Sequence, residues 1–306
     1  MAPEFHLFLP QMRMSMDELV ARARAAEASG FRGIALMDHL APPLALDQPM
    51  YEAMITAAWL AAHTTELTIG HLVLCDSLRH PAVLAKQAVS LDHASGGRFE
   101  LGIGSGSVPE ELATFGVGPT GAAGRTRRLA ETLDAVRALW SGEPVDFEGE
   151  TVTITAGRQL PAPLHRIPIV IGGAGPRTLA LVARHADWWN LPVYAVDRLE
   201  ELRPQAGAAR VSVQEMVTFI PSAGDRAAIE ATAARRFGGR RGRVVGTADE
   251  LVAHYRSLVA RGVERFYCWF TDFAPGATLE EFGATVVQEV AGDVPSGHGA
   301  RSDRGG

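Results

Sequence analysis

The fold is decided between residues 67 and 104, which read LTIGHLVL, CDSLRH, PAVLAKQAVSLDHA, SGG and RFELGIG. The first run is rich in β-forming residues and is interrupted only by Gly70 and His71. Pro81 suits the first turn of a helix, because its missing N–H would be unpaired there anyway. The last run alternates apolar residues with Glu100 and glycines, as a strand does. This stretch therefore predicts one β-α-β unit.

The same β-then-α pattern recurs along most of the chain. An apolar run at 5–9 precedes a capping box, Ser15 with Glu18, which opens a helix expected to end at Gly30. A second strand follows at 33–37. Further strands are expected at 168–172, 187–191, 211–220 and 265–270, helices at 51–64, 125–140 and from residue 176, and capping boxes at 247–250 and 278–281.

Repeated units with near-continuous apolar strands indicate a parallel sheet covered by helices. About eight of them favour a closed (β/α)₈ TIM barrel over an open doubly wound sheet, and so does the absence of an early G-x-G-x-x-G motif. We expect residues 1–291 to form one barrel domain, with an inserted polar loop at 105–124 and a small hairpin at 145–155. The glycine-rich tail at 292–306 is expected to be disordered.

The composition of the 306 residues is that of an ordinary globular enzyme, with 47% hydrophobic and 21% charged residues. The formal charge of -6 gives no electrostatic reason to bind nucleic acid. Cys75 and Cys268 lack the spacing of a disulfide framework or a zinc site, so no metal is expected. Because we find no leader and no apolar run of membrane length, we expect a cytoplasmic protein without membrane attachment.

Reactive groups of parallel barrels lie at the carboxyl ends of strands, so polar residues just after an apolar run are candidates. Asp38 and His39 follow the strand at 33–37. His39 is a candidate for donating to a cofactor ring or moving a proton, and Asp38 for setting its charge. In the alternative, Asp38 caps the loop and His39 is a satisfied polar residue. At 70–73, the glycine within a strand marks either the close approach of a flat ring or a packing defect.

Two glycine-rich turns complete the candidates. Residues 172–178 leave a strand and enter a helix at a proline, so backbone N–H groups, with Arg177 and Thr178, would cradle a phosphate. This strand counts as the fifth, whereas barrel phosphate sites usually follow the seventh and eighth, so either the hairpin disturbs the count or the site is unusual. Residues 102–107, followed by glutamates at 110–111, would admit a ligand or a lid. Aromatic candidates for a pocket wall, with the core as the alternative, are Trp188, Trp189, Trp269 and Phe273.

Three ordered motifs carry a family resemblance. The most specific reads RHPAVLAKQ from Arg79 and continues as LDHASGGRFELGIG at 91–104. The others are MDH at 37–39 and GGAG at 172–175, the latter followed by ADWWN at 186–190. Together they resemble the bacterial luciferase-like monooxygenase family of flavin- and deazaflavin-dependent (β/α)₈ barrels. The resemblance covers most of the chain and implies an oxidoreductase that uses coenzyme F420 or FMN, with F420 favoured, on a small organic substrate.

The resemblance also implies roles for particular residues. His39 falls where deazaflavin-dependent relatives have an acid-base or stabilising group near the reactive ring face. The Leu72–Val73 peptide falls where several relatives have a non-prolyl cis bond behind the ring, and residues 173–178 fall on the cofactor phosphate loop. The expected catalytic residues are His39 and Asp38, and the expected cofactor-binding residues are Leu72, Val73, Gly104, Ser105, Gly106, Ser107, Gly173, Ala174, Gly175, Arg177 and Thr178.

One position departs from the family pattern. Some deazaflavin enzymes have a catalytic glutamate directly after the Gly-x-Gly that matches 104–106, and this chain has Ser107 there. That difference counts against oxidation of sugar phosphates or alcohols through such a glutamate. The expected partners are a small-molecule substrate, a separate reductase that supplies reduced cofactor, and a second copy of the chain in a homodimer.

Two other classes of protein stay open at this point, a non-catalytic flavin-binding barrel and a barrel hydrolase. The hydrolase needs a bound metal or an activated serine. The first strand contains one histidine, His6, and no His-x-His, while residues 104–106 match a nucleophile elbow only in part.

Overall fold

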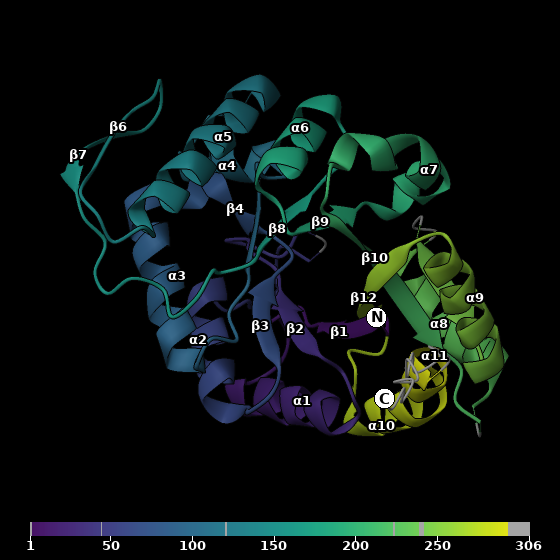
Figure 1. The fold of residues 1–306 in the computed structure, drawn as a ribbon. Coiled ribbons are helices and arrows are strands. Elements are labelled where there is room, and N and C mark those ends of the chain that lie inside the picture. Colours follow the sequence, from purple (N-terminus) through teal and green to yellow (C-terminus); the bar gives the residue numbers. More distant parts are fainter. Residues whose placement is uncertain (1, 44, 120, 223, 239–241, 293–306) are drawn as a thin grey trace, which may run out of the picture.

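The parallel strands of the chain curl into a nearly closed barrel that helices surround (Figure 1). The computed structural model describes residues 2–43, 45–119, 121–222, 224–238 and 242–292. The order around the barrel is β3-β2-β1-β12-β10-β9-β8-β5-β4. The strand bounds are β1 (Glu4–Phe8), β2 (Gly33–Leu36), β3 (Thr68–His71), β4 (Leu74–Cys75), β5 (Leu101–Gly104), β8 (Ile169–Gly172), β9 (Trp188–Leu191), β10 (Arg210–Phe219) and β12 (Val263–Phe270).

β3 and β4 share one place in the barrel, because only Leu72 and Val73 separate them. β4 pairs in parallel with β5. β3 reaches the segment just before β5, where the Ile69 amide donates to the Arg98 carbonyl and the Glu100 amide donates to the Ile69 carbonyl, both at 2.9 Å. The strands on this path thus fill the places of a (β/α)₈ barrel, and the predicted fold class is confirmed.

The helices begin largely where the capping signals predict. The Glu18 amide donates to Ser15 Oγ at 3.2 Å and the Ser15 amide to Glu18 Oε2 at 2.7 Å, so the first capping box is confirmed. The box predicted at 278–281 is wrong, because α10 begins earlier and Thr278 Oγ1 donates to Asp272 Oδ2 at 2.7 Å. The helices around the barrel are α1 (Met16–Ala28), α2 (Ala53–His63), α3 (Pro81–Ser95), α5 (Ala122–Leu139), α6 (Pro176–His185), α8 (Arg226–Phe237), α9 (Ala248–Ala260) and α10 (Gly276–Phe282).

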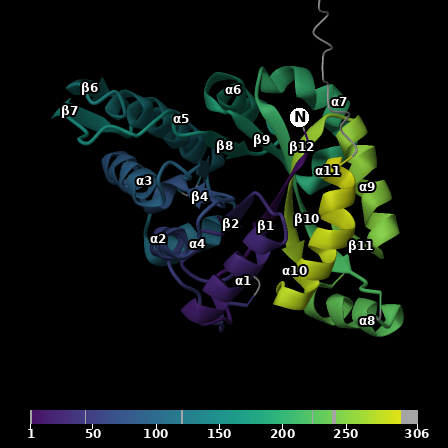
Figure 2. The ribbon, with the colours of Figure 1, turned by 60° about the horizontal axis from the view of Figure 1, so that its bottom comes forward.

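One helix and one strand were not predicted, whereas the hairpin was. α4 (Pro109–Phe115) lies within the segment expected to be a loop at 105–124. β11 (Arg243–Gly246), which the sequence did not reveal, pairs in parallel with the carboxyl end of β10. The predicted hairpin is confirmed as β6 (Val145–Glu148) and β7 (Thr153–Gly157), at the outer edge of the molecule beside α5 (Figures 1 and 2). The hairpin strands belong to a separate sheet, and β3 and β4 share one place in the barrel. Along the chain β8 is therefore the fifth barrel strand, which agrees with the count from the sequence.

The last described element of the chain is a short helix. Gly292 is the last residue of α11 (Gln288–Gly292), so the helix extends past the predicted domain end at residue 291. The rest of the predicted tail, 293–306, lies outside the described residues. None of the helices within the described ranges is long and apolar enough to cross a membrane.

A cluster of charged side chains lies near the amino-terminal ends of β1, β5 and β12. Arg265 is 3% exposed and pairs with Glu100 and Glu4, in each case with a nitrogen-oxygen distance of 2.7 Å. Its guanidinium lies 3.7 Å from the ring centroid of Trp188. A buried cation needs such partners, because removing an unpaired charge from water costs several kcal/mol. Of the aromatic candidates, Trp188 and Trp189 are core residues, being 3% and 0% exposed.

β5 approaches its neighbour so closely that two of its positions have no room for a side chain. A Cβ on Gly102 would lie 1.7 Å from the His71 carbonyl oxygen, and a Cβ on Gly104 would lie 2.7 Å from Val73 Cγ2. Gly102 therefore allows the close approach of two backbones, and Gly104 makes room for the Val73 side chain. This explains the Gly102-Ile103-Gly104 pattern without a ligand.

Replacing Gly102 with alanine tests this contact. Gly102→Ala is expected to lower the free energy of unfolding by about 3 kcal/mol or more, because overpacking forces the backbone of β3 or β5 to move. Urea unfolding measures the change. Gly276→Ala is the control, since a Cβ there would meet Ala25 at an ordinary 3.9 Å. Equal stability of the two variants would contradict the close-approach argument.

Candidate functional site

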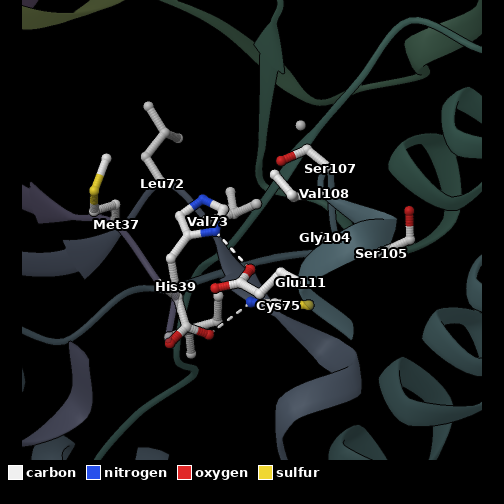
Figure 3. Close-up of a pocket in the computed structure, with 14 residues that line it drawn as sticks. Met37, His39, Leu72, Val73, Cys75, Gly104, Ser105, Ser107, Val108 and Glu111 are labelled. Atoms are coloured by element: carbon white, nitrogen blue, oxygen red, sulfur yellow. Dashed lines mark hydrogen bonds and ion pairs between the residues drawn. The ribbon is translucent and has the colours of Figure 1, made fainter. Parts of the chain in front are cut away.

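A cavity lies at the carboxyl ends of β2, β4, β5 and β8, where the strands pass into loops (Figure 3). Strand ends that are distant in the sequence thus meet at one place, as a parallel barrel requires. The lining residues are Met37, Asp38, His39, Leu72, Val73, Leu74, Cys75, Gly104, Ser105, Gly106, Ser107, Val108, Glu111 and Gly172.

The peptide between Leu72 and Val73 forms one wall of the cavity. It is a cis bond although no proline follows, so the expectation from the family resemblance is confirmed. Both side chains line the same cavity as His39 (Figure 3). A wall made of a peptide plane and two aliphatic side chains offers a flat, apolar surface. Such a surface fits one face of a tricyclic flavin-type ring.

His39 projects from the loop after β2, with its side chain 17% exposed. Its Nδ1 lies 2.8 Å from Glu111 Oε2. In Figure 3 the other ring nitrogen points away from Glu111, on the side of Leu72 and Val73. The imidazole is thus held by one nitrogen and presents the other to the cavity.

Asp38 has partners other than its neighbour His39. Its Oδ2 accepts from the Cys75 amide at 2.8 Å and from Arg79 at 2.6 Å, and its Oδ1 accepts from Arg79 at 2.9 Å. Arg79 also pairs with Glu52. Asp38 thereby ties the end of β2 to the chain just after the cis peptide. The idea that Asp38 sets the charge of His39 is corrected by this geometry, since the carboxylate in contact with the ring belongs to Glu111.

Glu111 is a residue of the site whose contact with His39 the sequence does not reveal. Glu111 lies in the first turn of α4, and its Oε1 accepts from the amides of Leu40 at 2.6 Å and Ala41 at 3.2 Å. A usable signal was present, because Pro109 followed by two glutamates is the pattern of a helix start. The contact with His39 has no local signal, since 72 residues separate the two.

The predicted phosphate loop borders the cavity. Gly172 lines the cavity, whereas residues 173–178 do not. Gly173 has φ of 138°, its carbonyl accepts from Trp189 Nε1 at 2.7 Å, and the α6 N-cap, Gly175, offers no side-chain cap. The first amides of α6 are therefore free of a side-chain acceptor, and Arg177 is exposed beside them. A helix start of this kind fits a phosphate.

Two other titratable groups near the cavity are held in their neutral forms. Burial lowers the pKa of His71 to about 4, and its Nε2 lies 3.2 Å from the Ala53 carbonyl, to which it donates. Burial also raises the pKa of the Cys75 thiol to about 11. At neutral pH neither group exchanges a proton readily. His39 is the histidine among the residues named as lining the cavity.

Comparison with known proteins gives the class. Residues 3–237 match the family described as luciferase-like monooxygenase, and the chain belongs to that family. It is 36% identical over 183 residues to an uncharacterized protein of Mycobacterium tuberculosis, which covers 55% of this chain and 62% of that protein. It is 29% identical over 301 residues to the F420-dependent hydroxymycolic acid dehydrogenase of Mycobacterium tuberculosis, covering 94% of this chain and 80% of that protein.

Two solved structures share the fold. One is an F420-dependent secondary alcohol dehydrogenase in complex with an F420-acetone adduct, with TM-score 0.80, 18% identity and coverage of 95% of this chain and 99% of that chain. The other is a riboflavin lyase with modified FMN and riboflavin, with TM-score 0.79, 19% identity and coverage of 98% and 94%. At these identities the likeness shows the fold alone. The family is described as luciferase-like monooxygenase, and two of the matched relatives are named as F420-dependent dehydrogenases, which agrees with the expected oxidoreductase class.

Acidification is expected to destabilise the protein through His71. The unfolded histidine has a pKa of about 6.5, and the folded one about 4. The unfolded chain therefore binds the proton more readily, so stability is full above pH 6.5 and falls as the pH drops toward 4, by about 3 kcal/mol from this group. Urea unfolding near neutral pH and near pH 5 measures the slope.

The matched variants are His71→Gln, whose side-chain amide can still donate to Ala53, and His165→Gln, whose side chain is 51% exposed. His71→Gln should lose much of the slope between these pH values and His165→Gln should keep it. An unaltered slope in His71→Gln would contradict the assignment to His71.

Proposed function

We propose that this protein is an F420-dependent oxidoreductase that oxidises a hydroxyl group of a small organic molecule. The observation that carries the proposal is the pairing of a flat aliphatic wall at Leu72–Val73 with the free nitrogen of His39 on the same side of the cavity. F420 is preferred to FMN because the 29%-identical relative that spans most of this chain is named for F420. Such a ring supplies two-electron hydride chemistry when it is bound.

Each residue of the cavity has its own role in the proposed reaction. In the proposal Leu72 and Val73 support one ring face, and His39 accepts or returns a proton at Nε2. Asp38 is a positioning residue, since its carboxylate is taken up by Arg79 and the Cys75 amide. The ring edge and its phosphate tail would meet the backbone and hydroxyl groups of Gly104, Ser105, Gly106, Ser107, Gly173, Ala174, Gly175, Arg177 and Thr178.

Ser107 bears on the reaction type. With serine in place of the glutamate that some deazaflavin enzymes have there, proton transfer must come from another side chain. His39 contacts a carboxylate from α4, so the cavity still contains an acid-base pair. Partners in the proposal are a small-molecule substrate and, if the cofactor is FMN, a separate reductase. The proposed location is the cytoplasm.

Cofactor and catalytic group are tested together. We expect fluorescence titration to show binding of F420 at about micromolar concentrations, and oxidised F420 to be consumed with 2-propanol or longer secondary alcohols. His39→Asn should leave F420 binding nearly intact and lower kcat by about 10²- to 10⁴-fold, because a proton acceptor is lost.

The control is His165→Asn, which should retain activity because that side chain is 51% exposed and lies outside the cavity. Binding of FMN with no binding of F420 would overturn the cofactor assignment. Binding of F420 without turnover of any acceptor would support the non-catalytic flavin-binding alternative instead.

A second copy of the chain is the proposed macromolecular partner. Ile55 and Trp59 lie four residues apart on α2 and are 67% and 42% exposed, so they form an apolar row on that helix; Tyr51, 42% exposed, lies just before it. Val83 on the adjoining α3 is 51% exposed. Exposed apolar rows of this kind are typical of protein-protein interfaces.

Light scattering after gel filtration tests the homodimer. The wild-type protein should have twice the 32.7 kDa mass of the chain, and Trp59→Glu should shift the population toward single chains because it places a charge in the apolar row. Tyr194→Glu, at a residue 67% exposed on η2 (Val193–Arg198), should leave the mass unchanged. A wild-type protein with the mass of one chain would exclude the homodimer.

A further inference from the structure

The two carboxylate oxygens of Glu111 have different hydrogen-bond partners. Oε1 accepts two backbone amides, those of Leu40 and Ala41, at 2.6 and 3.2 Å. Oε2 faces Nδ1 of His39 at 2.8 Å. The side chain is 9% exposed, so water does not compete freely for these contacts. One carboxylate from α4 therefore holds both the loop after β2 and the imidazole on that loop.

This arrangement determines which nitrogen of His39 carries the proton. An ionised carboxylate can only accept hydrogen bonds, so Nδ1 must be the donor in the contact with Oε2. A neutral imidazole has a single N–H, and Nε2 is then left with a free lone pair. Figure 3 shows Nε2 on the side of Leu72 and Val73, away from Glu111. The basic nitrogen thus faces the cavity.

We propose that Glu111 is the positioning residue that holds His39 in the Nδ1–H tautomer and so makes Nε2 the proton acceptor of the cavity. The use of that acceptor rests on the proposed function. In the oxidation of a hydroxyl group to a carbonyl, Nε2 would take the hydroxyl proton, and bound oxidised F420 would supply the two-electron oxidant that takes the hydride from carbon. The Glu111 carboxylate stays ionised and offsets the charge of the imidazolium.

The chemistry of the site narrows the substrate class. An acceptor at Nε2 is useful for a substrate that loses a proton from oxygen as it is oxidised. The side chains of Met37, Leu72 and Val73 contribute apolar surface to the cavity lining. The inferred substrates are therefore alcohols whose carbinol carbon is attached to apolar groups.

Glu111→Gln distinguishes this role from simple attachment of α4 to the loop. The amide oxygen of glutamine can still accept from Leu40 and Ala41, which keeps α4 in place. Its NH₂ group then faces Nδ1 and can only donate, so the proton of His39 must move to Nε2. The substitution is expected to invert the tautomer while the fold is retained. Glu110→Gln, on the exposed side of the same helix, is the matched control.

The tautomer is read directly by ¹⁵N NMR of protein labelled at histidine nitrogen, without cofactor, with His39→Asn used to assign the signal. We expect Nδ1–H in the wild type and in Glu110→Gln, and Nε2–H in Glu111→Gln. In turnover of oxidised F420 with 2-propanol, Glu111→Gln should lower kcat by about 10²-fold or more and leave F420 binding unchanged in the fluorescence titration.

An unchanged His39 tautomer in Glu111→Gln would overturn the proposal, as would an Nε2–H tautomer in the wild type. A thermal unfolding scan of each variant shows that the fold is retained. Because the NMR measurement needs no cofactor, failure of F420 to bind would overturn the proposed function alone and leave the tautomer result valid.

Discussion

The contact between β5 and the β3–β4 strand is the constraint on which the site depends. At Gly102 and Gly104 the interior of the barrel is occupied by the neighbouring chain, so that a Cβ at either position would lie within 3 Å of it. The chain that β5 contacts here continues into Leu72 and Val73, which line the cavity. A larger residue on β5 would displace that wall before it touched any ligand.

Beside this wall, the adjacent residues Asp38 and His39 have different partners, because their side chains point in different directions. Asp38 is 4% exposed and holds Arg79 and the Cys75 amide, so it fixes the chain that leaves the cis peptide. His39 turns to the mouth and meets Glu111. The buried ion pair therefore supports the wall, and the histidine that lines the cavity is a separate residue. This division resembles the general pattern in which a rigid scaffold positions loop-borne groups.

The fold could be read from the sequence because its signals are local. Strand periodicity, the capping box at Ser15, the proline at residue 81 and the turn glycines each act within a few residues, and together they fix the order of the barrel elements. The errors came where the signal was weak or short. α4 is a single short helix inside a glycine-rich segment, β11 pairs only with the end of β10, and Thr278 satisfies the capping pattern but bonds Asp272.

By itself the sequence determined the barrel, the family and the strand ends at which polar groups collect, since each follows from residue order along one segment. His39, the Leu72–Val73 peptide and the glycine loops were all found in this way. Only the tertiary structure decided which of these residues touch. It assigned Arg79 to Asp38 and Glu111 to His39, and it separated residues 173–178 from the cavity lining. The physical reason is that hydrogen bonds and ion pairs act over about 3 Å in space, while their partners lie 41 and 72 residues apart in the chain.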